Sequence, residues 1–146
     1  MKLFPDGRTV LRCFPVLLLL SGCGEPTPEC DSLDTRNTVI KIMSDDSHNA
    51  LVNYAAKNSS VVAAMVSNAN TQAEKSAILE KARQDAAYRL DDTIRTNSIN
   101  KANRAVTCTG LLYATVEDVT AQKELDFKVE QTVDGKISIS IRPFQF

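Results

Sequence analysis

The feature that most restricts the fold of this 146-residue chain is a change of hydrophobic period past its middle. From residue 123 onward, apolar residues begin to occupy every second position: Leu125, Phe127, Val129, Ile137, Ile139 and Ile141. A period of two is typical of a strand with one buried and one solvated face. The carboxyl-terminal part is therefore predicted to be an antiparallel meander with a single apolar face.

The turn between the last two strands is predicted from the same alternation. A two-residue loop at 134–135 would mix the buried and solvated faces. A three-residue loop at 133–135 instead sets Val129 opposite Ile139. Because the buried face fixes the register, we prefer this loop, with Gly135 in the left-handed position of a type I turn with a G1 bulge.

The segment from 31 to 66 is predicted to form short helices. Three residues are alternative N-caps for the first helix: Asp31, Ser32 and Asp34. Ser47 is expected to cap a second helix, and a short apolar stretch, 61–66, follows a break at 58–60.

A longer helix is predicted over 72–90. Thr71 and Glu74 form a capping-box pattern at its start. An apolar stripe then follows with helical spacing: Ile78, Ala82, Ala86 and Leu90. Beyond it, β-branched residues predict strands at 93–99 and 106–116.

Helices that precede strands indicate an α+β fold, with the amino-terminal helices on one face of an antiparallel sheet of about three or four strands. This layout resembles the cystatin-like or NTF2-like group of small folds. The resemblance is one of element order, and it carries no activity with it.

Charge and composition point away from nucleic-acid and metal partners. The formal net charge is −1, and acidic and basic residues are interspersed. Arg95, Lys101 and Arg104 are scattered without an aromatic partner, so no nucleic acid is expected. His48 is the only histidine, and the cysteines lack the close spacing of zinc sites. We expect no metal and no cofactor apart from covalent lipid.

The amino terminus reads as an export signal. Basic residues at Lys2, Arg8 and Arg12 precede an apolar run, 13–20, that is too short to span a bilayer. Glycines and prolines follow at once, which argues against the alternative of a short core helix.

The end of that signal resembles the lipobox of bacterial lipoproteins, in the residues Leu20-Ser21-Gly22-Cys23. The resemblance implies removal of 1–22 and a diacylglycerol on Cys23, often with a further acyl chain such as palmitate. Residues 23–29 would be a lipidated cysteine and a short tether, and 30–146 a single domain. Ordinary signal cleavage is the alternative.

The resemblance also suggests a location, the bacterial envelope. In proteobacteria an aspartate after the lipidated cysteine resembles an inner-membrane retention signal, and here that position is Gly24. The outer membrane, facing the periplasm, is therefore the default. Cys30 and Cys108 are then left as an exported pair, which predicts a disulfide, worth on the order of 4 kcal/mol in the chain-entropy model.

The sequence contains no nucleophile-elbow, phosphate-loop or zinc-protease motif. His48 is interpreted as an exposed histidine near a helix start, although a Ser-His-Asp arrangement assembled by the fold stays possible. Three acidic pairs lie at element boundaries, where capping and solvation explain them: Asp45-Asp46, Asp91-Asp92 and Glu117-Asp118. The chain is expected not to be an enzyme.

A binding role remains. One side of the 106–116 strand carries Tyr113 with hydroxyls from Thr107, Thr109 and Thr115. This set either forms a contact surface or has Tyr113 packed under a helix. Two aromatic residues near the end of the chain, Phe144 and Phe146, either pack on the core or meet a partner.

The predicted function is a noncatalytic, membrane-anchored lipoprotein that binds an envelope protein, as an immunity protein or inhibitor or as an accessory of secretion or conjugation. The alternative is a periplasmic lipoprotein that binds a small molecule or envelope component on the concave side of the sheet.

Overall fold

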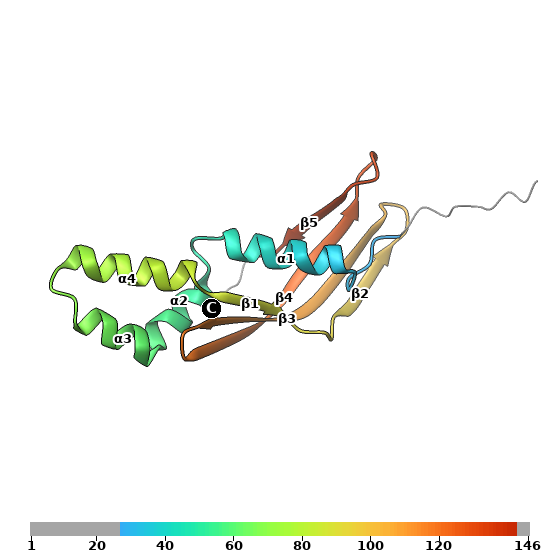
Figure 1. Cartoon of the computed structure of the whole chain (residues 1–146). Helices are drawn as coiled ribbons and strands as arrows, with labels where there is room; N and C mark the ends of the chain where they lie inside the picture. Colours follow the sequence, from blue (N-terminus) through green and yellow to red (C-terminus); the bar gives the residue numbers. More distant parts are fainter. Residues whose placement is uncertain (1–26, 143–146) are drawn as a thin grey trace, which may run out of the picture.

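The computed structural model describes residues 27–142 as four helices followed by five antiparallel strands (Figure 1). The helices are α1 (Leu33–Asp45), α2 (Ala50–Asn58), α3 (Ser60–Ser67) and α4 (Gln72–Gln84). The strands are β1 (Ala87–Leu90), β2 (Arg95–Asn100), β3 (Ala105–Val116), β4 (Val119–Gln131) and β5 (Ile137–Ile141). The predicted α+β order is confirmed.

The sheet is a meander whose first strand is interrupted. Its order is β1-β3-β4-β5, and β2 pairs with β3 beside β1. β1 pairs with residues 112–115 of β3, and β2 pairs with residues 105–109. The two short strands therefore share one edge of β3, which is why five strands replace the three or four expected. Gly110 lies where the edge is interrupted, and a Cβ there would come within 3.1 Å of Leu90 Cδ1.

The turn between β4 and β5 is the predicted one. Val129 lies opposite Ile139, as the three-residue loop requires. The Gly135 backbone N–H donates to Thr132 O at 2.9 Å, and Gly135 has φ +80°, in the left-handed region. The buried face, and not the Asp-Gly dipeptide, selected the loop length.

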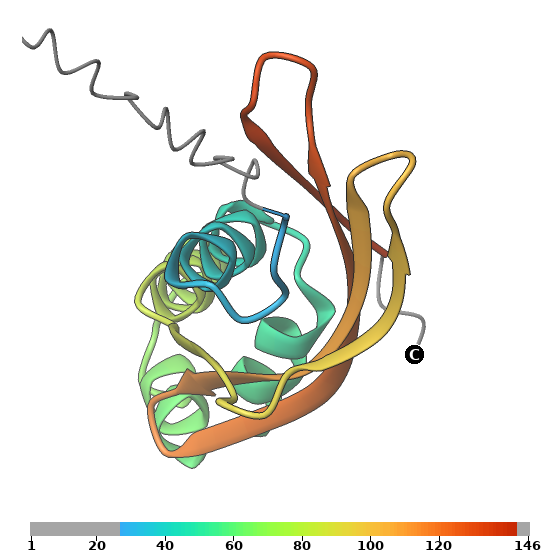
Figure 2. The ribbon, with the colours of Figure 1, turned by 90° about the vertical axis from the view of Figure 1, so that its right-hand side faces the viewer.

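The apolar face of the sheet curls around α1 and α2 (Figure 2). Alternate residues of β3 face these helices and are buried, among them Leu112 and Ala114, which have no exposed surface. Val39 of α1 and Ala55 of α2 are equally buried. The concave side of the described sheet is thus filled by helices.

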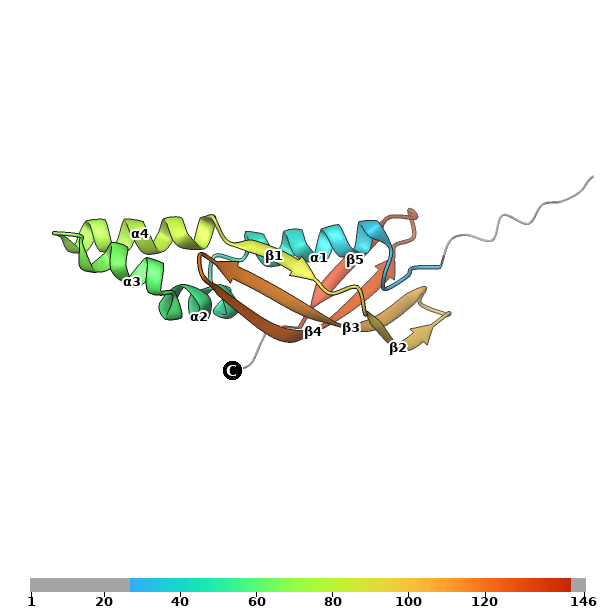
Figure 3. The ribbon, with the colours of Figure 1, turned by 60° about the horizontal axis from the view of Figure 1, so that its bottom comes forward.

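The other two helices form a projection, which we call the arm, made of α3 and α4 (residues 60–84). They pack on each other and extend past the end of the sheet (Figures 1 and 3). Val62 in α3 and Ala82 in α4 are the buried residues within these two helices. The arm is therefore held in place mainly by contacts at its base, because few of its own side chains are buried.

The predicted helix over 72–90 is wrong beyond Gln84. The capping box of Thr71 and Glu74 is present, but α4 ends at Gln84 and residues 87–90 are strand β1. Leu90, read as the last member of the helical stripe, lies opposite Leu112 and is buried. Pairing with β3 forms the backbone hydrogen bonds of this segment and also buries Leu90. These two gains outweigh the modest helix propensity of the segment.

The first two helices begin at different kinds of residue. Ser32 caps α1, as one of the three alternatives predicted. Ser47 does not cap α2; Asn49 does. The Asn49 side chain accepts from Leu51 N and donates to Met43 O, both at 3.0 Å, so one buried amide starts α2 and closes the end of α1.

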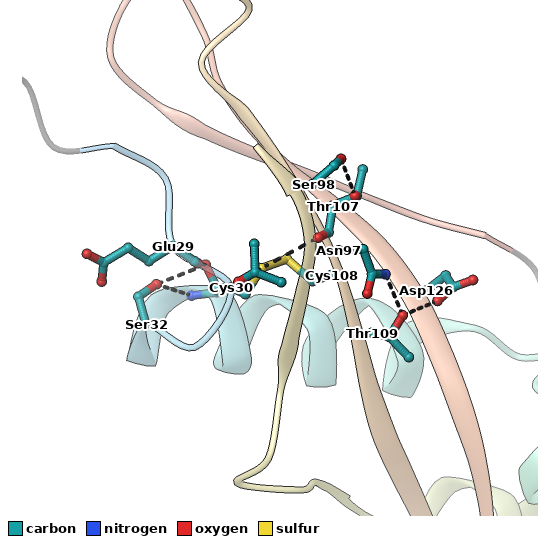
Figure 4. The surroundings of a disulfide bond; sticks show 11 residues. Glu29, Cys30, Ser32, Asn97, Ser98, Thr107, Cys108, Thr109 and Asp126 are labelled. Carbon is teal, nitrogen blue, oxygen red and sulfur yellow. Dashed lines mark hydrogen bonds between the residues drawn. A yellow bond between two sulfur atoms is a disulfide. The ribbon is translucent and has the colours of Figure 1, made fainter. Parts of the chain in front are cut away.

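The predicted disulfide between Cys30 and Cys108 is present (Figure 4). It joins the start of the domain to the central strand β3 across 78 residues. Pro28 is buried and Glu29 O accepts a hydrogen bond from Thr35 Oγ1 at 2.9 Å. The end of the expected tether thus packs on the domain instead of standing off it.

Candidate functional site

Among residues 27–142, the geometry around His48 does not form a catalytic triad. Its Nδ1 lies 3.1 Å from Ser47 Oγ, but both side chains are exposed and come from one turn. Asp46 accepts from the His48 backbone N–H at 2.9 Å, so its carboxylate stabilises the turn and does not orient the imidazole. A base without its orienting partner lacks the relation that makes a triad work.

Two of the three acidic pairs supply carboxylates that form ion pairs. Asp45 pairs with Lys41 at 2.8 Å, and Asp91 with Arg89 at 3.2 Å. Asp92 pairs with Arg36 at 2.7 Å, and Arg36 also donates to Leu90 O at 3.0 Å. The two Arg36 contacts tie α1 to the edge of the sheet, whereas the other two pairs are local.

Neither a metal site nor a deep ligand cavity stands out in residues 27–142. Those residues contain no group of three or more His, Cys, Asp or Glu side chains placed to hold a metal ion. Two hollows, of about 320 and 350 Å³, share Ile141 and Arg142 at the end of β5. Both volumes are at the lower end for ligand sites, and the first is lined partly by His48.

The predicted contact surface lies on the outer face of the sheet. Tyr113 points away from the helices, since its neighbours Leu112 and Ala114 are the buried ones. The Arg89 guanidinium lies 4.0 Å from the centroid of the Tyr113 ring, a cation–π contact. The alternative in which Tyr113 packs under a helix is therefore not what the structure shows.

The polar side chains of this outer face form hydrogen bonds with one another. Asn97 donates to Thr109 at 2.7 Å, and Thr109 donates to Asp126 (Figure 4). Thr115 and Thr120 share a hydrogen bond of 2.9 Å across the β3–β4 ladder. The outer face is thus polar and satisfied by cross-strand pairs, as is usual for the solvated side of an antiparallel sheet.

The arm carries an exposed apolar surface that the sequence did not assign to a site. Residues 61–66 of α3 are all apolar, yet only Val62 is fully buried, and the valines at 61 and 66 are half-buried. Ala63 and Ala64 are exposed, and Met65 keeps 44% of its surface. The sequence signal for this surface was a short helix without charged residues, which cannot bury all of its sides. The periodicity of the apolar residues alone does not reveal which side stays exposed.

A carboxylate fastens the base of the arm. Asp118, in the β3–β4 turn, accepts hydrogen bonds from the hydroxyls of Ser59 and Ser60, and from Ser60 N at 3.3 Å. These donors lower the pKa of Asp118 far below its ordinary value of 3.8. Since Ser59 is also the N-cap of α3, the carboxylate fixes where the arm leaves the domain.

Several predicted residues lie outside the described part of the chain. These are the signal 1–22, the lipidated Cys23, and the aromatic residues Phe144 and Phe146. Within residues 27–142, no helix is long and apolar enough to cross a membrane.

Comparisons with protein-family models, with curated proteins and with solved structures give no match for this chain. The likeness to cystatin-like and NTF2-like layouts thus stays one of element order.

Proposed function

We propose that this chain is a lipoprotein of the bacterial envelope, anchored through Cys23, whose domain binds another protein through the arm and catalyses no reaction. The observation that carries the binding role is the exposed apolar surface of α3. Exposed apolar patches on a small domain mark interaction sites more often than isolated apolar residues do.

The position of the arm supports a protein partner over the bilayer. The chain enters the domain at the end opposite to the arm (Figures 1 and 3). A domain tethered there directs α3 away from the membrane that holds it. Small residues and a methionine on one helix suit a groove or helix of a partner, because alanines allow close approach and methionine adapts to irregular surfaces.

A small-molecule role has no comparable support. The concave side of the sheet, where such a ligand was considered, is occupied by α1 and α2 (Figure 2). The outer face is a ladder of self-paired polar groups.

Site-specific photo-crosslinking tests the binding role. A photoreactive residue at Met65 of the lipidated protein in cells is expected to give a discrete crosslinked protein. Ala64→Glu should abolish that product, because a charge would be buried in the contact. Ala77→Glu, at an alanine of α4 that is also exposed but lies outside α3, is the control and should preserve it. A crosslinked product at Met65 that persists in Ala64→Glu contradicts a contact through the arm. The absence of any crosslinked product without that substitution contradicts it as well.

The anchor is tested separately. Fatty-acid labelling should mark the wild-type protein and disappear in Cys23→Ala. Labelling that persists in the variant overturns the lipoprotein assignment without touching the role of the arm.

A further inference from the structure

The end of the domain where the chain enters carries four exposed apolar side chains. Val133 is fully exposed at the β4–β5 turn, and Ile137 beside it keeps 46% of its surface. Ile99, next to the β2–β3 turn, keeps 59%, and Leu33, at the start of α1, keeps 72%. Three of these four come from strand ends or turns, where a polar residue would cost nothing.

These elements share one end of the molecule. The β2–β3 turn, the β4–β5 turn and the first turn of α1 all lie near the place where the described chain begins (Figures 1 and 2). The arm lies at the other end. Four of the seven exposed large apolar side chains of the described residues therefore come from elements around the point of attachment.

The tether leaves little freedom at this end. Pro28 is buried and Cys30 is fastened to β3, so only residues 24–27 separate Cys23 from the domain. Four extended residues span about 14 Å at most. A lipid on Cys23 would hold this end within roughly that distance of the lipid headgroups.

The charges of the two turns also suit a membrane surface. Residues 101–104 and 132–136 contain Lys101, Arg104 and Lys136 against the carboxylate of Asp134, which pairs with Lys136 at 3.1 Å, whereas the start of α1 carries exposed carboxylates at 31 and 34. An apolar tip flanked by cations is the composition expected at the headgroup region, where lysine and arginine meet phosphates and the apolar groups lie below them.

From these observations we propose that the two hairpin turns and Leu33 form a bilayer-contacting end, which seats the domain on the membrane and points the arm outward. The proposal rests on the lipid anchor of the proposed function. The partner of this end of the domain is the surface of the phospholipid bilayer that holds Cys23.

The absence of tryptophan from the whole chain permits a direct test. Val133→Trp, Ile99→Trp and, as control, Met65→Trp are prepared as full-length lipidated proteins. Each is reconstituted in phosphatidylethanolamine–phosphatidylglycerol vesicles, with and without brominated acyl chains. All three positions are exposed, so the folded domain accommodates the rings, and circular dichroism checks this.

We expect bromine to remove about half of the emission at Val133→Trp and Ile99→Trp, because interfacial apolar groups lie roughly 5–10 Å into the headgroup boundary. Met65→Trp should be unaffected. Equal emission with and without bromine in protein that floats with the vesicles overturns the bilayer contact and leaves the anchor intact. Quenching at Met65→Trp equal to that at Val133→Trp overturns the orientation. Wild-type protein that does not float with the vesicles overturns the anchor and the contact together.

Discussion

The sheet layer and the arm differ in how much of their apolar surface is buried. In the sheet layer, most residues of β3 are buried under the helices, and a disulfide closes the chain onto that strand. In the arm, two helices of 8 and 13 residues bury one residue each. An apolar helix left so open is either unstable or reserved for a contact. The hydrogen bonds from Ser59 and Ser60 to Asp118, which we call the clasp, hold α3 in place without covering it. Together with the helix caps, they favour the second interpretation, a helix reserved for a contact.

This difference predicts two levels of stability. The sheet layer should open only by global unfolding, whereas the arm should open locally at a lower free energy. Four changes test that contrast.

The largest effect is expected at the disulfide. Replacing both Cys30 and Cys108 by serine removes a link across 78 residues and should lower the free energy of unfolding by about 4 kcal/mol in the chain-entropy model. Urea unfolding measures this loss. Reduced wild type is the control and should behave like the double variant. An unchanged midpoint after reduction would mean that the bond adds nothing to the sheet layer.

A truncation in the core should come next. Leu112→Ala leaves a cavity at a fully buried position of β3 and should cost about 3 kcal/mol. Met65→Ala, on the exposed side of α3, should cost less than about 0.5 kcal/mol in the same measurement. Similar losses at both positions would erase the distinction between core and arm.

The caps of the arm should have a smaller and local effect. Thr71→Ala removes the hydroxyl that accepts from Glu74 N at 3.2 Å and should weaken α4 by about 1 kcal/mol. Amide hydrogen exchange should then speed up in α4 and stay unchanged in β3 and β4. Glu74→Gln keeps a side chain able to complete the capping box and serves as the control. Faster exchange throughout the sheet would show that the arm does not open on its own.

The smallest effect at neutral pH concerns the clasp. A carboxyl whose pKa is lowered by folding stabilises the folded state above its ordinary pKa, and this contribution is lost as the pH falls through the lowered value. For Asp118 the loss should begin below its ordinary value of 3.8. We expect exchange of α3 amides to accelerate there ahead of β3, and Asp118→Asn to flatten this dependence. Asp134, whose pKa is also lowered by hydrogen bonds but at the opposite end, is the control: Asp134→Asn should leave α3 unchanged.

Features governed by neighbouring residues were predictable. The capping box at Thr71 and the Val133-Asp134-Gly135 turn follow from local chemistry and a period of two, and both are present. The Cys30–Cys108 pair followed from counting. The end of α4 was not predictable, because the residues after Gln84 suit a helix and become a strand only beside β3.

The candidate site shows the same division. The sequence marked the outer residues of β3, and the strand does place Tyr113 and its threonines on one face. It did not mark α3, because an apolar stretch such as 61–66 looks the same whether a domain covers it or leaves it open. The hydrogen bond between Ser59 and Asp118 joins residues 59 positions apart, and no local sequence pattern predicts it.

By itself, then, the sequence determined the α+β order, the register of the last hairpin, the disulfide and a lipobox-like amino terminus, since each depends on spacing along the chain. Tertiary structure alone decided which apolar residues are buried. Burial depends on what other segments cover, and the fold covers Leu90 and Leu112 while it leaves Met65 and Val133 in contact with solvent at its two ends.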